Sequence, residues 1–263
     1  MLLTILGEFV LPHGGVVWTS TIVRSLGVLR VEERNARQAV SRLADQGIVG
    51  VEKQGRRARW HLTEHGHQML TAGTERIYRF GSGGDAWDGR WSVVLCSVPE
   101  EQRARRHQLR TRLEFAGFGF LAPGVAISPH LDREHVASDV LQALRLAPAA
   151  VVLRAETVGA VPDEDLLRRA WDLRSLGAGY DEFIASFERR APASDEACFA
   201  DLVELVHAWR RFPFVDPEIP ARLLPTAWPG RTAKALFDAQ HAAWATGANA
   251  WFERIDGRYS TDP

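Results

Sequence analysis

The sequence predicts an α+β protein with three segments in succession. Near the N-terminus, apolar residues at helical spacing lead into a strongly basic hairpin pattern. In the middle, runs of β-forming residues alternate with helical stretches in the order βαββαβ, which is the order of a ferredoxin-like domain. The remainder is mostly helical in its periodicity. We therefore expect an N-terminal domain over residues 1–80, a middle domain over 87–175 and a mostly helical C-terminal domain over 176–263.

The composition is that of a globular protein. Hydrophobic residues make up 46% and charged residues 25% of the 263 positions, so we expect a core of useful size and no wholesale disorder. The net charge is −1, yet eight basic and only four acidic residues lie between Arg30 and Leu62. A basic module on an otherwise acidic chain is typical of a DNA-binding domain joined to a sensing domain.

Four helices and one hairpin are expected in the N-terminal domain. The first helix carries apolar residues from Leu2 to Val10 and lacks the basic start of a signal peptide. Thr19 or Ser20 is expected to cap the second helix, and Gly47 to end the third. The helices are expected at about residues 2–10, 20–27, 31–46 and 64–80, the last capped by Thr63, and the hairpin at 48–62 with its turn at 54–57.

The third helix has two unlike faces. On a helical wheel, small and apolar side chains fall together and would pack against the first two helices. The opposite face suits DNA, because arginine can fork to guanine, glutamine to adenine, and serine reaches a base or a phosphate. The candidate DNA-binding residues are Arg34, Arg37, Gln38, Ser41 and Arg42 on this helix, with Lys53, Gln54, Arg56, Arg57 and Arg59 on the hairpin, or wing.

A solvated basic helix followed by a basic turn is the alternative interpretation of this pattern. The order helix, helix, helix and basic hairpin is harder to obtain by chance. It favours a winged helix-turn-helix that binds DNA. A winged helix that binds another protein is a further alternative.

The middle and C-terminal domains follow a glycine-rich linker at residues 81–85. Strands are expected at residues 91–98, 117–123, 125–128 and 149–157, with helices at 100–115 and within 130–146. Further helices are expected at residues 163–176, 180–189, 194–212 and 233–252, and a proline-rich connection separates the last two.

Residues for metal or enzymatic chemistry are not grouped along the chain. Cys96 and Cys198 form no CxxC pair, and the closest histidine pairs have no third ligand at a clear spacing. We therefore expect no catalytic residue, no metal site and no cofactor. No apolar run approaches the length of about 18 residues that spans a membrane. The expected location is the cytoplasm, where both cysteines stay reduced.

Several motifs, taken together, resemble one family of bacterial regulators. Their order and spacing are specific, and they run through essentially the whole chain. They are residues 31–43 (VEERNARQAVSRL), 87–91 (WDGRW), 113–125 (LEFAGFGFLAPGV), 171–173 (WDL), 212–214 (FPF), 216–217 (DP), 223–225 (LLP) and 228–230 (WPG). By these motifs the chain resembles the PaaX family of repressors, which regulate phenylacetic acid catabolism.

The resemblance implies a winged helix, a middle domain similar to Cas2 and a helical C-terminal domain. It also implies a homodimer on paired half-sites of a double-stranded DNA operator, and release of the DNA when an acyl-CoA such as phenylacetyl-CoA binds. A regulator of the same family with an unrelated small-molecule effector is an alternative. A Cas2-like metal-dependent nuclease is another, but the strand at residues 91–98 carries no acidic residue for a metal.

Candidate residues for the effector come from the aromatic and basic residues beyond the first domain. Arg210 and Arg211 lie beside an aromatic motif and suit an anionic group such as a CoA phosphate. Two exposed arginines at a helix end are the alternative. Tryptophans could line an apolar pocket, but we interpret each first as a core residue. The candidate effector-binding residues are Trp171, Arg174, Arg210, Arg211 and Phe214.

Overall fold

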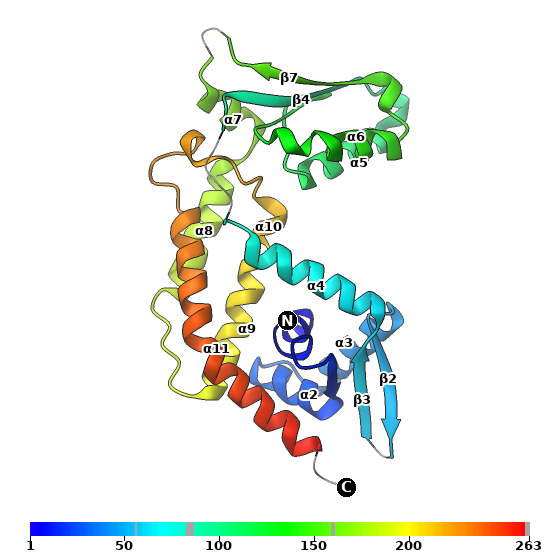
Figure 1. Ribbon diagram of the computed structural model, residues 1–263, viewed down its shortest axis with the longest axis vertical. Helices are drawn as coiled ribbons and strands as arrows, with labels where there is room; N and C mark the ends of the chain where they lie inside the picture. The colour runs from blue at the N-terminus through cyan, green and yellow to red at the C-terminus, as the bar shows by residue number, and fades with distance from the viewer. Residues whose placement is uncertain (56, 83–86, 159–160, 261–263) are drawn as a thin grey trace. The chain divides into compact units, whose positions relative to one another are not determined.

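The computed structural model describes residues 1–55, 57–82, 87–158 and 161–260, so Arg56 of the predicted wing lies outside the described residues. The chain forms two compact units (Figure 1). Unit 1 contains Met1–Phe80, Phe183–Arg211 and Thr232–Pro263, and unit 2 contains Gly81–Glu182 and Phe212–Arg231. The C-terminal segment of the sequence therefore contributes to both units.

Unit 1 begins with the predicted winged helix. The helices are α1 (Leu2–Ile5), which continues as the short π-helix η1 (Leu6–Val10), then α2 (Thr19–Val28), α3 (Glu33–Asp45) and α4 (Glu64–Arg79). The strands are β1 (Val16–Trp18), β2 (Val49–Gln54) and β3 (Arg57–Leu62). They form an antiparallel sheet in the order β1-β3-β2, with the β2–β3 hairpin as the wing.

Two local signals end and start helices as the sequence predicts. Gly47 adopts a φ of +70°, and Ile48 N donates to Leu43 O at 2.9 Å, so a left-handed turn closes α3. Thr63 caps α4, because Gly66 N donates to Thr63 Oγ1 at 3.0 Å. The short connections on either side of the wing are therefore encoded locally.

The predicted cap of α2 is wrong. The residue in the N-cap position is Trp18, and its side chain makes no capping hydrogen bond. Thr19 Oγ1 instead donates to Ala58 O and accepts from Trp60 Nε1, both at 2.9 Å. The hydroxyl is used to tie α2 to β3, because a partner distant in sequence competes with the backbone of the helix start.

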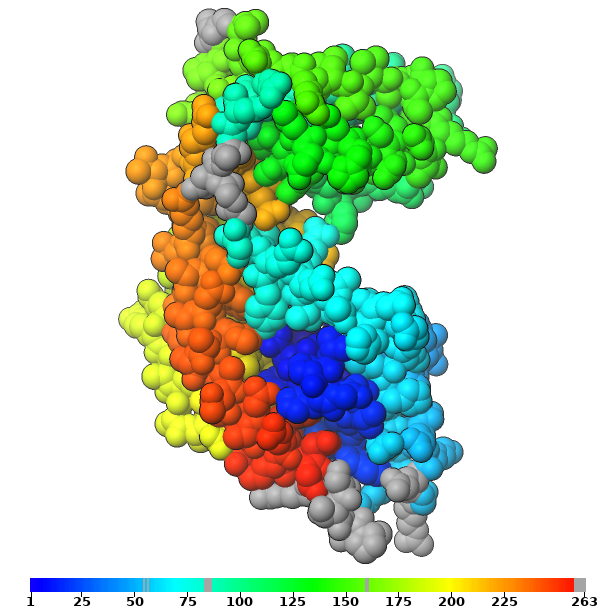
Figure 2. All heavy atoms as spheres, in the orientation of Figure 1, coloured from blue at the N-terminus to red at the C-terminus, as the bar shows by residue number. Residues whose placement is uncertain are grey.

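One whole C-terminal helix and parts of two others complete unit 1. The whole helix is α9 (Asp195–Trp209), and the other two are α8 (Leu173–Phe187) and α11 (Gly230–Ser260). The buried ring of Phe9 lies 4.8 Å from the ring of Phe199 on α9 and 5.2 Å from that of Phe252 on α11. Figure 2 shows the N-terminal residues in blue against the red end of α11 and the cyan α4. The core of the winged helix is therefore continuous with that of the C-terminal helices.

Unit 2 is built on a four-stranded antiparallel sheet. Its strands are β4 (Arg90–Cys96), β5 (Gly119–Ala122), β6 (Val125–Ser128) and β7 (Ala150–Glu156). Its longer helices are α5 (Arg103–Phe115) and α6 (Glu134–Ala143), accompanied by the short turns η2 (Glu100–Gln102), η3 (Leu131–Arg133) and η4 (Ala147–Ala149). The strand order β5-β6-β4-β7 confirms the predicted βαββαβ topology.

The two faces of this sheet are covered differently. On one face, Val94 and Cys96 of β4 pack with Leu109, Leu113 and the buried side chains of α6. On the other face, Trp91 lies in a second cluster with residues of α7 (Asp163–Ala170) and of the turn η5 (Ala221–Leu223). The short helix α10 (Phe212–Val215) precedes that turn.

The single helix predicted at residues 163–176 is wrong. α7 ends before Trp171, whose backbone is extended, and α8 starts at Leu173. Asp172 accepts hydrogen bonds from Ser175 N at 3.0 Å and from Ser175 Oγ at 2.7 Å. These bonds satisfy free donors at a new helix start, which explains the interruption. The predicted helix at residues 180–189 forms the C-terminal half of α8.

Candidate nucleic-acid interface

α3 presents one packed face and one exposed face. Ala36, Val40 and Leu43 are buried and hold the helix against the rest of the winged helix, including α2. The small Ala36 is fully buried, which lets α3 lie close to its neighbours. All five predicted DNA-binding residues of this helix are exposed on the other side: Arg34, Arg37, Gln38, Ser41 and Arg42.

The exposed arginines of α3 lose little free energy if they leave their present partners for another ligand. Arg37 Nε donates to Glu33 Oε1 at 2.8 Å, one turn away, and both side chains are more than half exposed. An exposed pair of this spacing contributes only about 0.3–0.5 kcal/mol, so Arg37 can exchange Glu33 for a phosphate or a base. Within the described residues, Arg34 and Arg42 have no ion-pair partner. The face is thus a cluster of accessible arginines.

The wing does not present its basic residues on one side. Cross-strand partners lie on the same face of a sheet. Glu52 pairs with Arg59 and Gln54 pairs with Arg57, whereas Lys53 pairs with Ala58. Lys53 is exposed on the face opposite to that of Arg57 and Arg59. The side chains of Gln54 and Arg56 lie outside what the structure describes.

Arg59 already has partners inside the protein. Its Nη2 donates to Glu52 Oε2 at 3.2 Å, and its guanidinium carbon lies 6.0 Å from the ring centre of Trp18. Both contacts hold Arg59 along the sheet. Lys53 is therefore more exposed than Arg57 and Arg59, and phosphate contacts by the wing stay a prediction.

The candidate effector residues are divided between the two units. Trp171, Arg174 and Phe214 belong to unit 2, and Arg210 and Arg211 belong to unit 1. Arg174 is exposed on α8, and Phe214 is 45% exposed, with its ring 5.9 Å from that of Phe115. Their role in effector binding stays a prediction.

Trp171 and Arg210 also have structural contacts. The Trp171 ring lies 6.5 Å from that of Trp91, and a Cβ at Gly119 would approach Trp171 within 2.5 Å. This close packing favours a core role for Trp171. Arg210 Nη1 donates to Thr4 Oγ1 at 3.5 Å.

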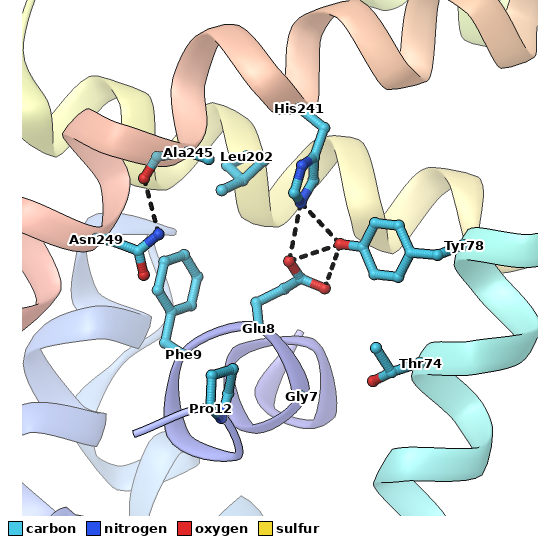
Figure 3. A pocket seen from close by; sticks show the side chains of 10 residues that line it. All are labelled: Gly7, Glu8, Phe9, Pro12, Thr74, Tyr78, Leu202, His241, Ala245 and Asn249. Carbon is cyan, nitrogen blue, oxygen red and sulfur yellow. Dashed lines mark hydrogen bonds and ion pairs between the residues drawn. The ribbon is translucent and has the colours of Figure 1, made fainter. Parts of the chain in front are cut away.

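The structure brings together three residues that the sequence analysis did not connect: Glu8, Tyr78 and His241 (Figure 3). The Tyr78 hydroxyl donates to both carboxylate oxygens of Glu8, at 2.6 and 2.7 Å. His241 Nε2 lies 2.7 Å from the Tyr78 hydroxyl and 3.1 Å from Glu8 Oε2. Burial and the Glu8 carboxylate raise the pKa of Tyr78, so its hydroxyl stays protonated. No local pattern marks these residues, which are far apart in sequence.

In the described part of the chain, no group of three or more His, Cys, Asp or Glu side chains is placed to hold a metal ion. Among the same residues, every helix is too short or too polar to cross a membrane.

Comparison with known proteins gives one consistent family. Residues 1–66 match the model "PaaX-like protein", residues 84–167 match "PaaX protein central Cas2-like domain", and residues 171–254 match "PaaX-like protein C-terminal domain". The chain is 30% identical over 241 residues to Transcriptional repressor PaaX of Escherichia coli (strain K12), covering 88% of this chain and 75% of that protein.

A solved structure has the same fold. The Uncharacterized protein Rv0674 from Mycobacterium tuberculosis aligns with a TM-score of 0.64 at 22% identity, over 94% of this chain and 96% of that one. Fold and family models together define an α+β protein with an N-terminal winged helix, a Cas2-like middle domain and a helical C-terminal domain. The chain belongs to the PaaX family, which confirms the resemblance seen in its motifs.

Proposed function

We propose that this protein is a transcriptional repressor that binds double-stranded operator DNA through α3 and the wing. The observation that carries the proposal is the exposed face of α3, where Arg34, Arg37 and Arg42 surround Gln38 and Ser41. Such a face can enter the major groove while the wing reaches the phosphates. The similarity to a transcriptional repressor supports the same function. We expect the protein to be located in the cytoplasm, where its operator DNA would lie.

A titration by fluorescence anisotropy tests this function directly. The labelled duplex is the region upstream of the protein's own gene, and a scrambled duplex of equal length is the control. We expect tighter binding to the upstream duplex, with an affinity that falls as salt rises, because phosphate contacts release counterions. Equal affinity for both duplexes at every salt concentration would contradict the proposal.

We also propose that the protein acts as a homodimer through unit 2. The family resemblance supports this, and so does an exposed apolar pair on the sheet. Leu95 and Val151 face each other across β4 and β7 and are 39% and 56% exposed. A twofold contact would cover this patch with its own copy, so that one apolar surface meets another. On the operator, such a dimer is expected to place one copy of α3 in each of two paired half-sites.

For the effector we propose an acyl-CoA, with phenylacetyl-CoA as the first candidate. The family resemblance supports this choice. The candidate residues for its phosphates and acyl group are Trp171, Arg174, Arg210, Arg211 and Phe214. The test adds a panel of acyl-CoAs, with free CoA as the control, to the preformed DNA complex. One thioester should release the DNA. A complex insensitive to every thioester would contradict this effector class and point to an unrelated ligand, without affecting the repressor proposal.

A Cas2-like nuclease is the second candidate. Against it stands β4, whose residues Arg90–Cys96 include no carboxylate. Incubation of labelled DNA and RNA with Mg²⁺ or Mn²⁺ separates the two functions. We expect intact nucleic acid, and metal-dependent cleavage abolished by a chelator would favour the enzyme.

A further inference from the structure

A small cavity lies inside unit 1, where the N-terminal helix meets α4, α9 and α11. Its volume is about 250 Å³. Four sequence regions supply its walls, and Figure 3 shows their side chains converging on it. The lining consists of Gly7, Glu8, Phe9, Pro12, Thr74, Tyr78, Leu202, His241, Ala245 and Asn249. The π-helix η1 carries three of these residues, and such local departures from α-helix geometry are frequent at functional sites.

One wall of the cavity is a negative pole. The side chain of Glu8 is 11% exposed, and its carboxylate accepts a hydrogen bond from the Tyr78 hydroxyl. His241 Nε2 lies 3.1 Å from Glu8 Oε2. A carboxylate has about four acceptor sites, so capacity for a further donor remains. Asp238 is already paired with Lys234 at 2.6 Å, so the negative charge of this wall comes from Glu8. The Glu8 carboxylate therefore favours a ligand with a positively charged hydrogen-bond donor.

The remaining polar groups are also suited to a donor. Asn249 Nδ2 donates to Ala245 O at 2.9 Å, which uses one hydrogen of the amide NH₂ and leaves the other hydrogen and the acceptor Oδ1. The Thr74 hydroxyl has no partner within the described residues and can accept as well. Phe9 and Leu202 provide buried apolar walls. An ammonium group with a compact apolar body satisfies both parts of this lining.

We propose that this cavity binds a small organic cation, a primary ammonium attached to a compact hydrocarbon group. Glu8 accepts from the ammonium, Thr74 Oγ1 accepts another of its hydrogens, and Phe9 and Leu202 contact the hydrocarbon. Pockets for drug-sized ligands have volumes of about 300–1,000 Å³, so this cavity is too small for a CoA thioester. It is therefore a site separate from that of the proposed acyl-CoA effector, and it does not depend on DNA binding.

Isothermal titration with benzylammonium chloride at pH 7 tests the proposal on the full chain. Benzyl alcohol and sodium benzoate have nearly the same shape with zero and negative charge. We expect benzylammonium to bind and both analogues to bind at least about tenfold more weakly, because a charge-assisted hydrogen bond is lost. No heat of binding with up to about 10 mM benzylammonium, or equal affinity for the alcohol, would overturn the proposal.

Variants locate the binding to this cavity. Glu8→Gln keeps the side-chain shape and removes the charge, and it should weaken benzylammonium binding about tenfold or more. Glu75→Gln is the matched control, since Glu75 is an exposed residue on α4. If Glu8→Gln does not fold, judged by circular dichroism, Thr74→Val replaces it: it keeps the side-chain shape, removes an accepting hydroxyl, and should weaken binding about threefold or more. Undiminished binding in a folded Glu8→Gln or Thr74→Val variant would overturn the site.

Discussion

Thr21 Oγ1 donates a hydrogen bond of 2.7 Å to Oδ1 of Asp256 and so joins the second helix of the winged helix to the end of α11. Thr21 is fully buried. Its helix, α2, packs against α3, which carries the proposed DNA-binding face. The position of α3 therefore depends on the C-terminal helix, although more than two hundred residues separate the two ends of this bond.

Thr21→Val should lower the free energy of unfolding. The substitution keeps the shape and removes the donor to a carboxylate, a bond that contributes about 1.5–3 kcal/mol. Urea denaturation followed by circular dichroism measures the change. Thr232→Val, an exposed threonine on α11, is the control and should leave the midpoint within the error. Equal midpoints for both variants would show that the bond between Thr21 and Asp256 does not stabilise the fold.

Arg34→Ala should weaken operator binding by about ten- to a hundredfold, because a base contact contributes about 1–3 kcal/mol. The measurement is the anisotropy titration with the upstream duplex. Arg189→Ala provides the matched control: its side chain is 89% exposed and lies in the same unit, outside the winged helix. Comparable affinity of Arg34→Ala and the wild type would remove α3 from the proposed interface.

Val151→Glu should convert the proposed dimer into monomers. A carboxylate placed at the centre of a twofold apolar contact meets its own copy and must be desolvated without a partner. Light scattering coupled to size exclusion measures the mass. Val161→Glu, another exposed valine of unit 2, is the control and should stay dimeric. If both variants remain dimers, the Leu95–Val151 patch is not the interface.

Asp216→Asn should change the dependence of stability on pH. Burial raises the pKa of Asp216, whose carboxyl accepts hydrogen bonds from Tyr180 Oη at 2.5 Å and Glu218 N at 2.6 Å. A raised pKa means that the folded state binds the proton more tightly than the unfolded chain does. The stabilisation that protonated Asp216 provides is therefore complete at a pH below the ordinary pKa of an aspartate. It is lost as the pH rises through the raised pKa of the folded state.

The difference between wild type and variant isolates this contribution. Urea midpoints measured from acid to neutral pH should show the wild type losing stability relative to Asp216→Asn as pH rises. Asp181→Asn, at an exposed position on α8, serves as the control and should follow the wild type. A constant difference between wild type and Asp216→Asn at all pH values would contradict the assignment.

Much of the fold was accessible from the sequence because its signals are local. Gly47 and Thr63 mark helix ends within a few residues of the backbone groups that they satisfy. Alternating strands separated by helices predicted the βαββαβ order of unit 2. The helical periodicity of α3 predicted which side is buried, since a period of 3.6 residues places Ala36, Val40 and Leu43 together.

Only the tertiary structure decided the relations between distant segments. The division of the wing into two faces follows from strand register, which places Lys53 opposite Ala58 rather than beside Arg59. Glu8, Tyr78 and His241 meet because the N-terminal helix packs between α4 and α11. Sequence periodicity records which side of a helix is apolar but not which helix covers it. The sequence by itself thus determined most of the elements and the family, whereas packing over long separations decided the shared core of unit 1 and its cavity.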